Sequence, residues 1–574
     1  MINDIKSIIS FLPRAIKFRL LITIALTICC ALFEVISLGS VIPFVGIVLT
    51  PEVASEVSLF GLEVYLPHFA KASDSKLFII ILFIIAAISA GLFRILLLWI
   101  GIQVSNTSGA FLSAQIFEKN LYKNFVYHSK LNSSEIVSAI SQKIVVVISI
   151  LQSVITILTS SVIGGAIVAI LLYVNFVPSM LVLTFFALTY AFVLFFLKSK
   201  MQRNGMLIAS RQTLSTKILQ EALMGVRELT MSGQRHREVQ NYKKVMEVLQ
   251  KAIGENQFYT LGPRYLLECF ALVTLGIFSL VAVGVELDIN KTLPYLALLA
   301  VAGQKILPLF QQIYGCLSYF RGGEAALNDV ANLLSEKTIT SDGNVVLEKI
   351  DSIIFDDVQF QYPSPKELIL DDIKFEINGG DKVALVGNTG SGKSTLIDLL
   401  LGLLSPSKGR IMVNSCDLTN LKMEKFYSLI SHVPQTVFLL DGTIKENIVF
   451  DAEHENVDNT RLDKVCDLAM LTEYISSLPE SYNTRVGERG MMLSGGERQR
   501  IGIARALYKN ASLVIFDEST NALDKVTHQK IIANIFDHYK QAIIIFISHQ
   551  KISNQYCNKI IQIQNKTTHV SVKK

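Results

Sequence analysis

The chain has 574 residues, too many for one ordinary hydrophobic core. From the usual length of a domain, about three to four domain-sized units are expected. Hydrophobic residues make up 51% of it, which points to a membrane protein, and the formal net charge of +5 gives no case for nucleic-acid binding. Its seven cysteines form no C-x-x-C pair, so neither a zinc site nor a disulfide framework is indicated.

The first 335 residues are predicted to form an all-α membrane domain of six helices. No cleavable signal peptide is evident, because the first apolar run begins late and is too long for one. Each apolar run reaches the ~20 residues that a helix needs to cross a bilayer, give or take one. The runs cover residues 20–49, 77–102, 144–174, 179–197, 265–285 and 293–319.

Basic residues predict how this domain is oriented. Lys and Arg are frequent before the first span, between the second and third, and between the fourth and fifth, whereas residues 50–76, 175–178 and 286–292 carry few. Since cytoplasmic connections carry the excess of basic residues, both termini are expected in the cytoplasm.

The two longer inside connections, residues 108–142 and 198–257, have helical rather than loop-like sequence. Membrane helices that continue into the cytoplasm before turning back would explain this, and free cytoplasmic loops are the alternative. The first turn is predicted near Asn132, which has capping-box spacing to Glu135, and the second at residues 224–233. The C-terminal domain could push on the membrane domain at these turns.

Charged residues inside the spans need an explanation, because each costs a few kcal/mol at the bilayer centre. Arg264 and Glu268 follow Pro263, a good first helical position, and could pair on one helix face. A polar pathway for a hydrophilic or anionic group is one interpretation of these charges, and structural pairing is the other. Glu34 has no partner in its own helix, which favours the pathway. The charged residues considered for this pathway are Glu34, Arg94, Arg264, Glu268 and Lys305.

A linker at residues 336–350 precedes the second domain, 351–574, which is organised around a phosphate-binding loop. An apolar run suited to a buried strand leads into G-x-x-x-x-G-K-[ST], and an apolar helical run follows. Glycines let backbone N–H groups turn toward an anion, and the positive end of the helix adds to that field. Lys393 would reach the β- and γ-phosphates and Ser394 would bind Mg²⁺. The loop is Gly387, Asn388, Thr389, Gly390, Ser391, Gly392, Lys393, Ser394 and Thr395.

Two further positions suit a nucleotide. Tyr362 ends a strand-like run and could stack on adenine, although alone it would be a core tyrosine. Gln435 could give an oxygen ligand to Mg²⁺ and sense the γ-phosphate. A second glycine-rich helix N-terminus, able to hold phosphate, is formed by Ser494, Gly495, Gly496 and Glu497.

Catalytic groups are predicted at the ends of two buried strands. Asp517 suits Mg²⁺ bound through water, and Glu518 suits polarising an attacking water. His549 ends the second strand, where an imidazole can contact the γ-phosphate.

This ordered set resembles an ATP-binding cassette exporter with fused membrane and nucleotide domains, one half of a dimer, over essentially the whole chain. The resemblance implies a C-terminal α/β P-loop NTPase domain that binds ATP and Mg²⁺. It makes Tyr362 the A-loop, 387–395 Walker A, Gln435 the Q-loop, 493–497 the signature, Asp517 Walker B, Glu518 the catalytic carboxylate, 521–524 the D-loop and His549 the switch.

Residues 484–490 are similar to the exporter-specific X-loop. Small departures from the family pattern are Glu497 where Gln is usual, Asn521 where Ser is usual and Gln550 where Arg is common. None of them removes a catalytic group.

Two short stretches, residues 33–44 and 263–268, resemble segments of bacterial flippases for lipid-linked oligosaccharides and related glycolipid exporters. The implied protein is a homodimer in the bacterial inner membrane that couples Mg-ATP hydrolysis to export or flipping of such a lipid. A heterodimer, a peptide or drug exporter, and a membrane ATPase that gates or signals without transport are the alternatives.

Overall fold

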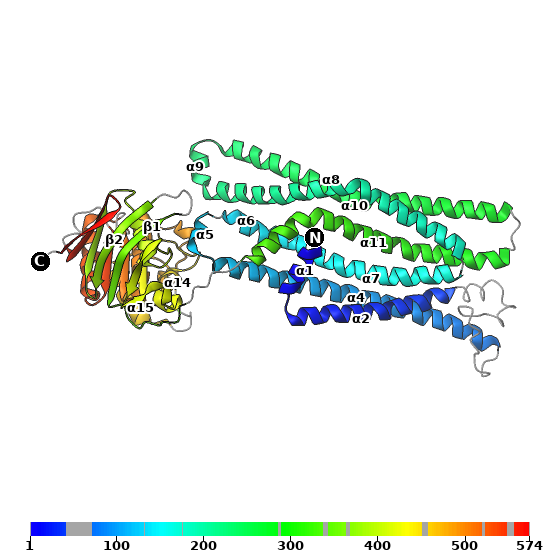
Figure 1. Ribbon diagram of the computed structural model, residues 1–574, viewed down its shortest axis with the longest axis horizontal. Coiled ribbons are helices and arrows are strands. Elements are labelled where there is room, and N and C mark those ends of the chain that lie inside the picture. Colours follow the sequence, from blue (N-terminus) through cyan, green and yellow to red (C-terminus); the bar gives the residue numbers. More distant parts are fainter. Residues whose placement is uncertain are drawn as a thin grey trace. The chain divides into compact units, whose positions relative to one another are not determined.

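The computed structural model describes residues 2–41, 72–130, 132–174, 176–284, 289–336, 343–362, 368–450, 457–518, 523–547 and 556–572. The chain divides into two compact units, residues 1–123 with 130–338 and residues 124–129 with 339–574. The first unit is helical, and the second carries two β-sheets (Figure 1).

Six long helices form the first unit, as the sequence predicts. They are α2 (Arg14–Gly39), α4 (Ala72–Leu121), α7 (Ile144–Val174), α8 (Phe176–Met224), α10 (Arg235–Gly284) and α11 (Ile289–Ser335), with α1 (Ile2–Phe11) before them. Among the described residues, three segments are long and apolar enough to cross a membrane: Arg14–Gly39, Phe83–Leu121 and Ser133–Tyr173. Four of the helices have 47 to 50 residues, far more than the ~20 that a bilayer needs. Long helices rather than free loops therefore form the inside connections.

Both predicted turns lie where the sequence places them. The first contains α5 (Phe125–Lys130), α6 (Ser133–Ser138) and a π-helical turn (Ala139–Lys143), and the Asn132 side chain caps α6 by accepting from the N–H of Ser134. The second consists of α9 (Val226–Met231), which joins the neighbouring helices α8 and α10 (Figure 1). Residues 124–129 cluster with the second unit, and Val126 packs against its core.

The second unit is built on a six-stranded sheet of order β10-β9-β3-β8-β7-β6, whose strands β9, β3, β8, β7 and β6 are parallel. Every residue of β8 is buried, because parallel strands are covered on both faces. The strands are β3 (Lys382–Gly387), β6 (Ile430–Val433), β7 (Leu513–Asp517), β8 (Ile543–Ile547), β9 (Lys559–Gln564) and β10 (Thr567–Val572).

A smaller antiparallel sheet of order β2-β1-β4-β5 and several helices complete this unit. Ligands of open α/β sheets bind beyond the carboxyl ends of the parallel strands, and Asp517 and Glu518 stand at the carboxyl end of β7. The remaining elements are β1 (Ser352–Gln361), β2 (Leu368–Asn378), β4 (Lys408–Val413), β5 (Cys416–Asp417), α12 (Lys393–Leu400), α13 (Met423–Ser428), α14 (Ile444–Ile448), α15 (Asn459–Leu468), α16 (Thr472–Ser477), α17 (Gly495–Lys509) and α18 (Lys525–His538). This confirms the predicted α/β nucleotide-binding fold.

Two glycines let α8 and α11 approach each other closely in the first unit. Gly205 is buried, and a Cβ added to it would lie 2.2 Å from the carbonyl oxygen of Gly322. Helices that cross with their backbones in contact require such small residues. The packing of α8 on α11 therefore depends on the missing side chain.

We expect Gly205→Ala to lower the stability of the membrane domain by about 1 to 3 kcal/mol, because the added methyl group forces the two backbones apart. Gly254→Ala, at an exposed site of α10 where an added Cβ meets nothing within 4 Å, should be neutral or slightly stabilising, since alanine has the higher helix propensity. The measurement is the melting temperature of the purified protein. Equal melting temperatures for the two variants would contradict the close approach.

Candidate functional site

The phosphate-binding loop lies between β3 and α12, as predicted. Gly390 and Gly392 have φ values of +80° and +99°, and a Cβ on Gly392 would lie 2.8 Å from Leu370. A Cβ on Gly387 would lie 2.5 Å from the Ser391 hydroxyl. A positive φ therefore favours glycine at positions 390 and 392, and lack of space favours it at positions 387 and 392.

Charge and an unsatisfied hydroxyl inside the loop fit a polyphosphate. The Lys393 Nζ donates to the carbonyl oxygens of Gly387 at 2.8 Å and Asn388 at 3.0 Å. The Ser391 hydroxyl is buried and has no hydrogen-bond partner among the described residues. A buried polar group without a partner is costly, so this hydroxyl is suited to an incoming phosphate oxygen. Asn388 and Thr389 are exposed at the tip of the loop, and Thr395 is buried in the first turn of α12.

Glu518 and Gln435, which are 83 positions apart in the chain, come together beside the loop. The Gln435 Nε2 donates to Glu518 Oε2 at 3.1 Å. Glu518 has φ +47° and its N–H donates to the carbonyl oxygen of Ile547 at the end of β8. A non-glycine residue held in this left-handed region is strained by about 1 to 3 kcal/mol, which is common at functional sites.

Two aspartates near the loop have raised pKa values. Burial raises the pKa of Asp517, the neighbouring Glu518 raises it further, and Lys393 opposes both. On α12, burial and the charge of Asp517 raise the pKa of Asp398 to about 6. Asp398 was not among the predicted site residues, although an acid inside the apolar run of residues 396–404 is a signal for such a site.

The signature residues form the N-terminus of α17. Ser494 caps this helix: its Oγ accepts from the Glu497 N–H at 3.3 Å, and a Glu497 carboxylate oxygen accepts from the Ser494 N–H at 2.7 Å. Burial, followed by the nearby charge of Glu497, raises the pKa of Tyr474 on α16. Gly495 and Gly496 stand at the first two helical positions, where backbone N–H groups have no partner within the helix. The glutamate therefore serves as a helix cap, a role that its S-x-x-E spacing could have indicated.

The other predicted residues of the nucleotide site are less fully described. Tyr362 is half-buried after β1 and meets Phe360 edge to face at 5.0 Å between ring centroids. Asp524 caps α18 by accepting from the N–H groups of Val526 and Thr527. Asn521 and His549 lie outside the described residues.

In the membrane domain, Glu34 pairs with two cations from other helices. Its Oε1 lies 2.7 Å from Arg94 Nε on α4, and its Oε2 lies 2.7 Å from Lys305 Nζ on α11. Glu34 is 2% exposed, whereas the Arg94 and Lys305 side chains are 39% and 25% exposed. The Nη2 of Arg94 is buried and has no hydrogen-bond partner in the described part of the chain. Three of the predicted intramembrane charges thus form one cluster that joins α2, α4 and α11.

The other two intramembrane charges form a separate pair. Arg264 and Glu268 make an i, i+4 ion pair on α10, as the spacing predicts. Their side chains are 46% and 36% exposed, so this pair is far more accessible than Glu34.

Comparisons with known proteins agree with this fold. The family model of the ABC transporter matches residues 370–521, and that of the ABC transporter transmembrane region matches residues 7–301, just over half of the chain. The chain is similar to the "Putative export ATP-binding/permease protein" of Rickettsia bellii, with 36% identity over 44% of each protein. The "ATP-dependent lipid A-core flippase" of Cupriavidus pinatubonensis is 27% identical over 80% of this chain and 79% of that protein.

Two further matches are a transporter named for a different cargo and a solved exporter structure. The "Glutathione/L-cysteine transport system ATP-binding/permease protein CydD" of Bacillus subtilis is 29% identical over 68% of each protein. Among solved structures, a bacterial Atm1-family ABC exporter with ATP bound matches with a TM-score of 0.78 and 20% identity, over 98% of this chain and 96% of that one. At that identity the likeness concerns the fold alone.

We expect Glu34→Gln to destabilise the membrane domain, because it leaves Arg94 and Lys305 facing each other without a counter-charge. Breaking a buried pair costs about 3 to 5 kcal/mol, and the partial exposure of both cations should put the loss at the lower end. Lys305→Met added to Glu34→Gln should recover part of the melting temperature, since contacting residues are energetically coupled. Arg264→Gln, in the exposed pair, is the control and should change stability little. A Glu34→Gln protein as stable as the wild type would show that the carboxylate does not hold the two cations.

The raised pKa of Asp398 makes a prediction about pH. The folded protein holds this proton more tightly than the unfolded chain, so the aspartate's contribution to stability declines as pH rises through about 6. Asp398→Asn should therefore raise the melting temperature of the nucleotide-free domain at pH 8, by roughly 2 to 4 °C, and change it little at pH 4. Asp441→Asn, at an exposed aspartate, is the control. A gain that is larger at pH 4 than at pH 8 would have the wrong sign for this explanation.

Proposed function

The chain belongs to the ABC transporter family, and on that premise we propose that it couples ATP hydrolysis to the export or flipping of an amphiphilic lipid-linked glycan across a bacterial cytoplasmic membrane. The proposed substrate class rests on the charged cluster in the membrane domain. In this cluster one carboxylate, Glu34, faces the two cations Arg94 and Lys305. The cluster has an excess of one positive charge, and both cations remain partly exposed. A partly exposed cation at membrane depth suits an anionic headgroup whose lipid tail stays in the bilayer.

Hydrolysis is assigned to the residues around the phosphate-binding loop. The Lys393 ammonium and the N–H groups of the loop bind the β- and γ-phosphates, and Tyr362 stacks on the adenine. Ser394, Gln435 and Asp517 would hold Mg²⁺, which neutralises phosphate charge when bound. Glu518 orients and polarises the attacking water, and His549 is proposed to contact the γ-phosphate. The Gln435–Glu518 hydrogen bond would place the catalytic carboxylate under the control of the nucleotide state.

A homodimer is the proposed working unit. One chain supplies both the phosphate-binding loop and the signature, so two copies suffice for two complete sites. In the family arrangement the Ser494 end of α17 from one subunit closes over the loop of the other, and phosphates then meet two helix N-termini. The distribution of basic residues supports a cytoplasmic location for the nucleotide domain and both termini.

Within the membrane domain, Glu34 is proposed to hold Arg94 and Lys305 in place rather than to touch the substrate. This follows from its burial and its two ion pairs. Arg264 and Glu268 could contribute a second polar position along the path, since their pair is exposed. The relative named a lipid A-core flippase supports a glycolipid substrate, and the relative named a glutathione and cysteine transporter supplies the contrasting cargo for a test.

The test compares wild type, Glu518→Gln and Arg94→Gln in proteoliposomes. Glu518→Gln should keep ATP binding and lose at least ~10²-fold in hydrolysis, because a positioned acid–base group contributes that much. Lys393→Ala should instead weaken ATP binding itself.

Wild type should flip a fluorescent lipid-linked oligosaccharide only with ATP, whereas Arg94→Gln should hydrolyse ATP but flip poorly. Uptake of reduced glutathione in place of lipid flipping would overturn the glycolipid assignment, and normal hydrolysis by Glu518→Gln would overturn the catalytic one.

A further inference from the structure

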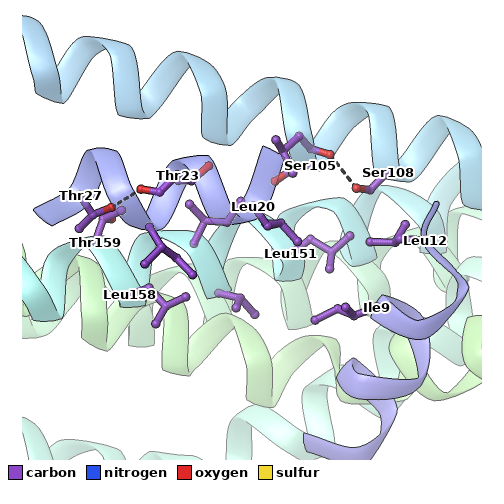
Figure 2. A pocket seen from close by; sticks show the side chains of 14 residues that line it. Ile9, Leu12, Leu20, Thr23, Thr27, Ser105, Ser108, Leu151, Leu158 and Thr159 are labelled. Atoms are coloured by element: carbon purple, nitrogen blue, oxygen red, sulfur yellow. Dashed lines mark hydrogen bonds between the residues drawn. The ribbon is translucent and has the colours of Figure 1, made fainter. Parts of the chain in front are cut away.

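A cavity of about 180 Å³ lies in the membrane domain between α1, α2, α4 and α7 (Figure 2). Nine of its lining residues are aliphatic and the other five are serine or threonine. Helix α1 contributes Ile9, and the turn after it contributes Leu12. The cavity has an open side, because Ile24 and Leu158, which line it, are 47% and 49% exposed. Apolar cavities of about this size stay dry and accept apolar molecules. Its shape and lining therefore suit a hydrocarbon chain that enters from the bilayer.

One hydroxyl in the wall is not satisfied by the protein. Thr23, Thr27 and Ser108 each donate to a backbone carbonyl of their own helix, at 2.9, 2.7 and 2.7 Å, and Figure 2 shows the last two of these bonds. Ser105 is fully buried, lines the same cavity, and its Oγ has no hydrogen-bond partner among the described residues. A buried hydroxyl needs an acceptor, and the carbonyl oxygen of an acyl ester is one that could arrive with a hydrocarbon chain.

A positive charge lies beside Ser105, on the surface formed by α2 and α4. A neighbouring surface groove is lined by Arg19, Trp99 and Gln103 and shares Val104 with the cavity, while Leu20 and Ser105 are the adjacent cavity residues. Arg19 is exposed, and Trp99 is 60% exposed. Arginine and tryptophan are typical of the membrane interface, where lipid phosphates and glycerol esters lie. The unsatisfied hydroxyl thus lies level with these interfacial residues, at the depth of the lipid ester. The cavity extends from it toward Thr27 on one side and toward Leu12 and Ile9 on the other (Figure 2).

We propose that this cavity binds one acyl chain of an anionic glycerophospholipid of the inner leaflet, with its ester carbonyl accepting from Ser105 and its phosphate near Arg19. The bound lipid fills the space between α1 and the bundle, so it stabilises the docking of α1. This site is separate from the cluster at Glu34 and does not depend on what the protein transports.

The test uses the full-length chain and two probes, phosphatidylglycerol and phosphatidylcholine. Native mass spectrometry of wild type should show one phosphatidylglycerol per chain that survives dilution, and phosphatidylglycerol should raise the melting temperature by several degrees more than phosphatidylcholine. Ser105→Leu, which fills the cavity, should reduce lipid retention at least tenfold. Ser108→Ala is the matched control on the same wall and should retain the lipid. Arg19→Gln should remove the preference for phosphatidylglycerol over phosphatidylcholine.

Leu158→Trp provides a second variant should Ser105→Leu fail to fold, because it narrows the open side at an exposed position. Retention that is unchanged in Leu158→Trp would overturn the proposal. So would equal binding of both lipids to wild type, or a cavity that proves to be filled by water. Loss of transport alone would bear on the proposed function and not on this site, since the readouts here are lipid retention and melting temperature.

Discussion

The membrane domain depends on one carboxylate that is held between two cations. Glu34 is 2% exposed and contacts Arg94 on α4 and Lys305 on α11, so its ion pairs join three helices at one depth. In a low-dielectric surrounding an ionised carboxylate without partners would cost several kcal/mol, so the buried Glu34 needs at least one of these cations as a partner. Apolar packing between membrane helices is non-specific in lipid, because lipid tails are as apolar as the side chains. The cluster supplies the directional contacts that fix which face of α2 meets α4 and α11.

The parts of the fold that follow a local pattern could be predicted from the sequence. The apolar runs gave the six helices, and the spacing of the glycines around Lys393 gave the loop between β3 and α12. The partners of Glu34 could not be predicted, because Lys305 is 271 positions away and nothing in the local sequence shows which helices adjoin. The same holds for Gln435 and Glu518, whose contact depends on the order of strands in the parallel sheet. Glu497 departs from the family pattern, and its hydrogen bonds show that it completes a capping box at the start of α17.

The chain itself provides a mechanical link between the two units. Residues 124–129 cluster with the nucleotide unit while α4 and α6 on either side belong to the membrane unit, and Val126 packs against the core that includes β1 and β2. After α6 the chain passes through the π-helical turn (Ala139–Lys143) into α7. In this turn Lys143 is buried and pairs with Asp329 of α11 at 2.6 Å. A π-helical turn holds one extra residue, and such turns are common at functional positions. The chain therefore runs from α5 through α6 to α7 by way of a turn that an ion pair anchors to α11.

Acidic groups gather near the phosphate-binding loop. The charges of Asp398 and Glu518 both act on Asp517, Lys393 lies close enough to oppose them, and burial with mutual repulsion raises the pKa of both aspartates. A site with this excess of negative charge repels a polyphosphate unless positive charge accompanies it. The Lys393 ammonium meanwhile donates to the carbonyl oxygens of Gly387 and Asn388, contacts that a phosphate can replace at little cost because they are neutral acceptors. The backbone of Glu518 is held in the left-handed region, which a non-glycine residue adopts only where the surrounding structure maintains it, so the fold keeps a geometry that the local sequence would not adopt alone.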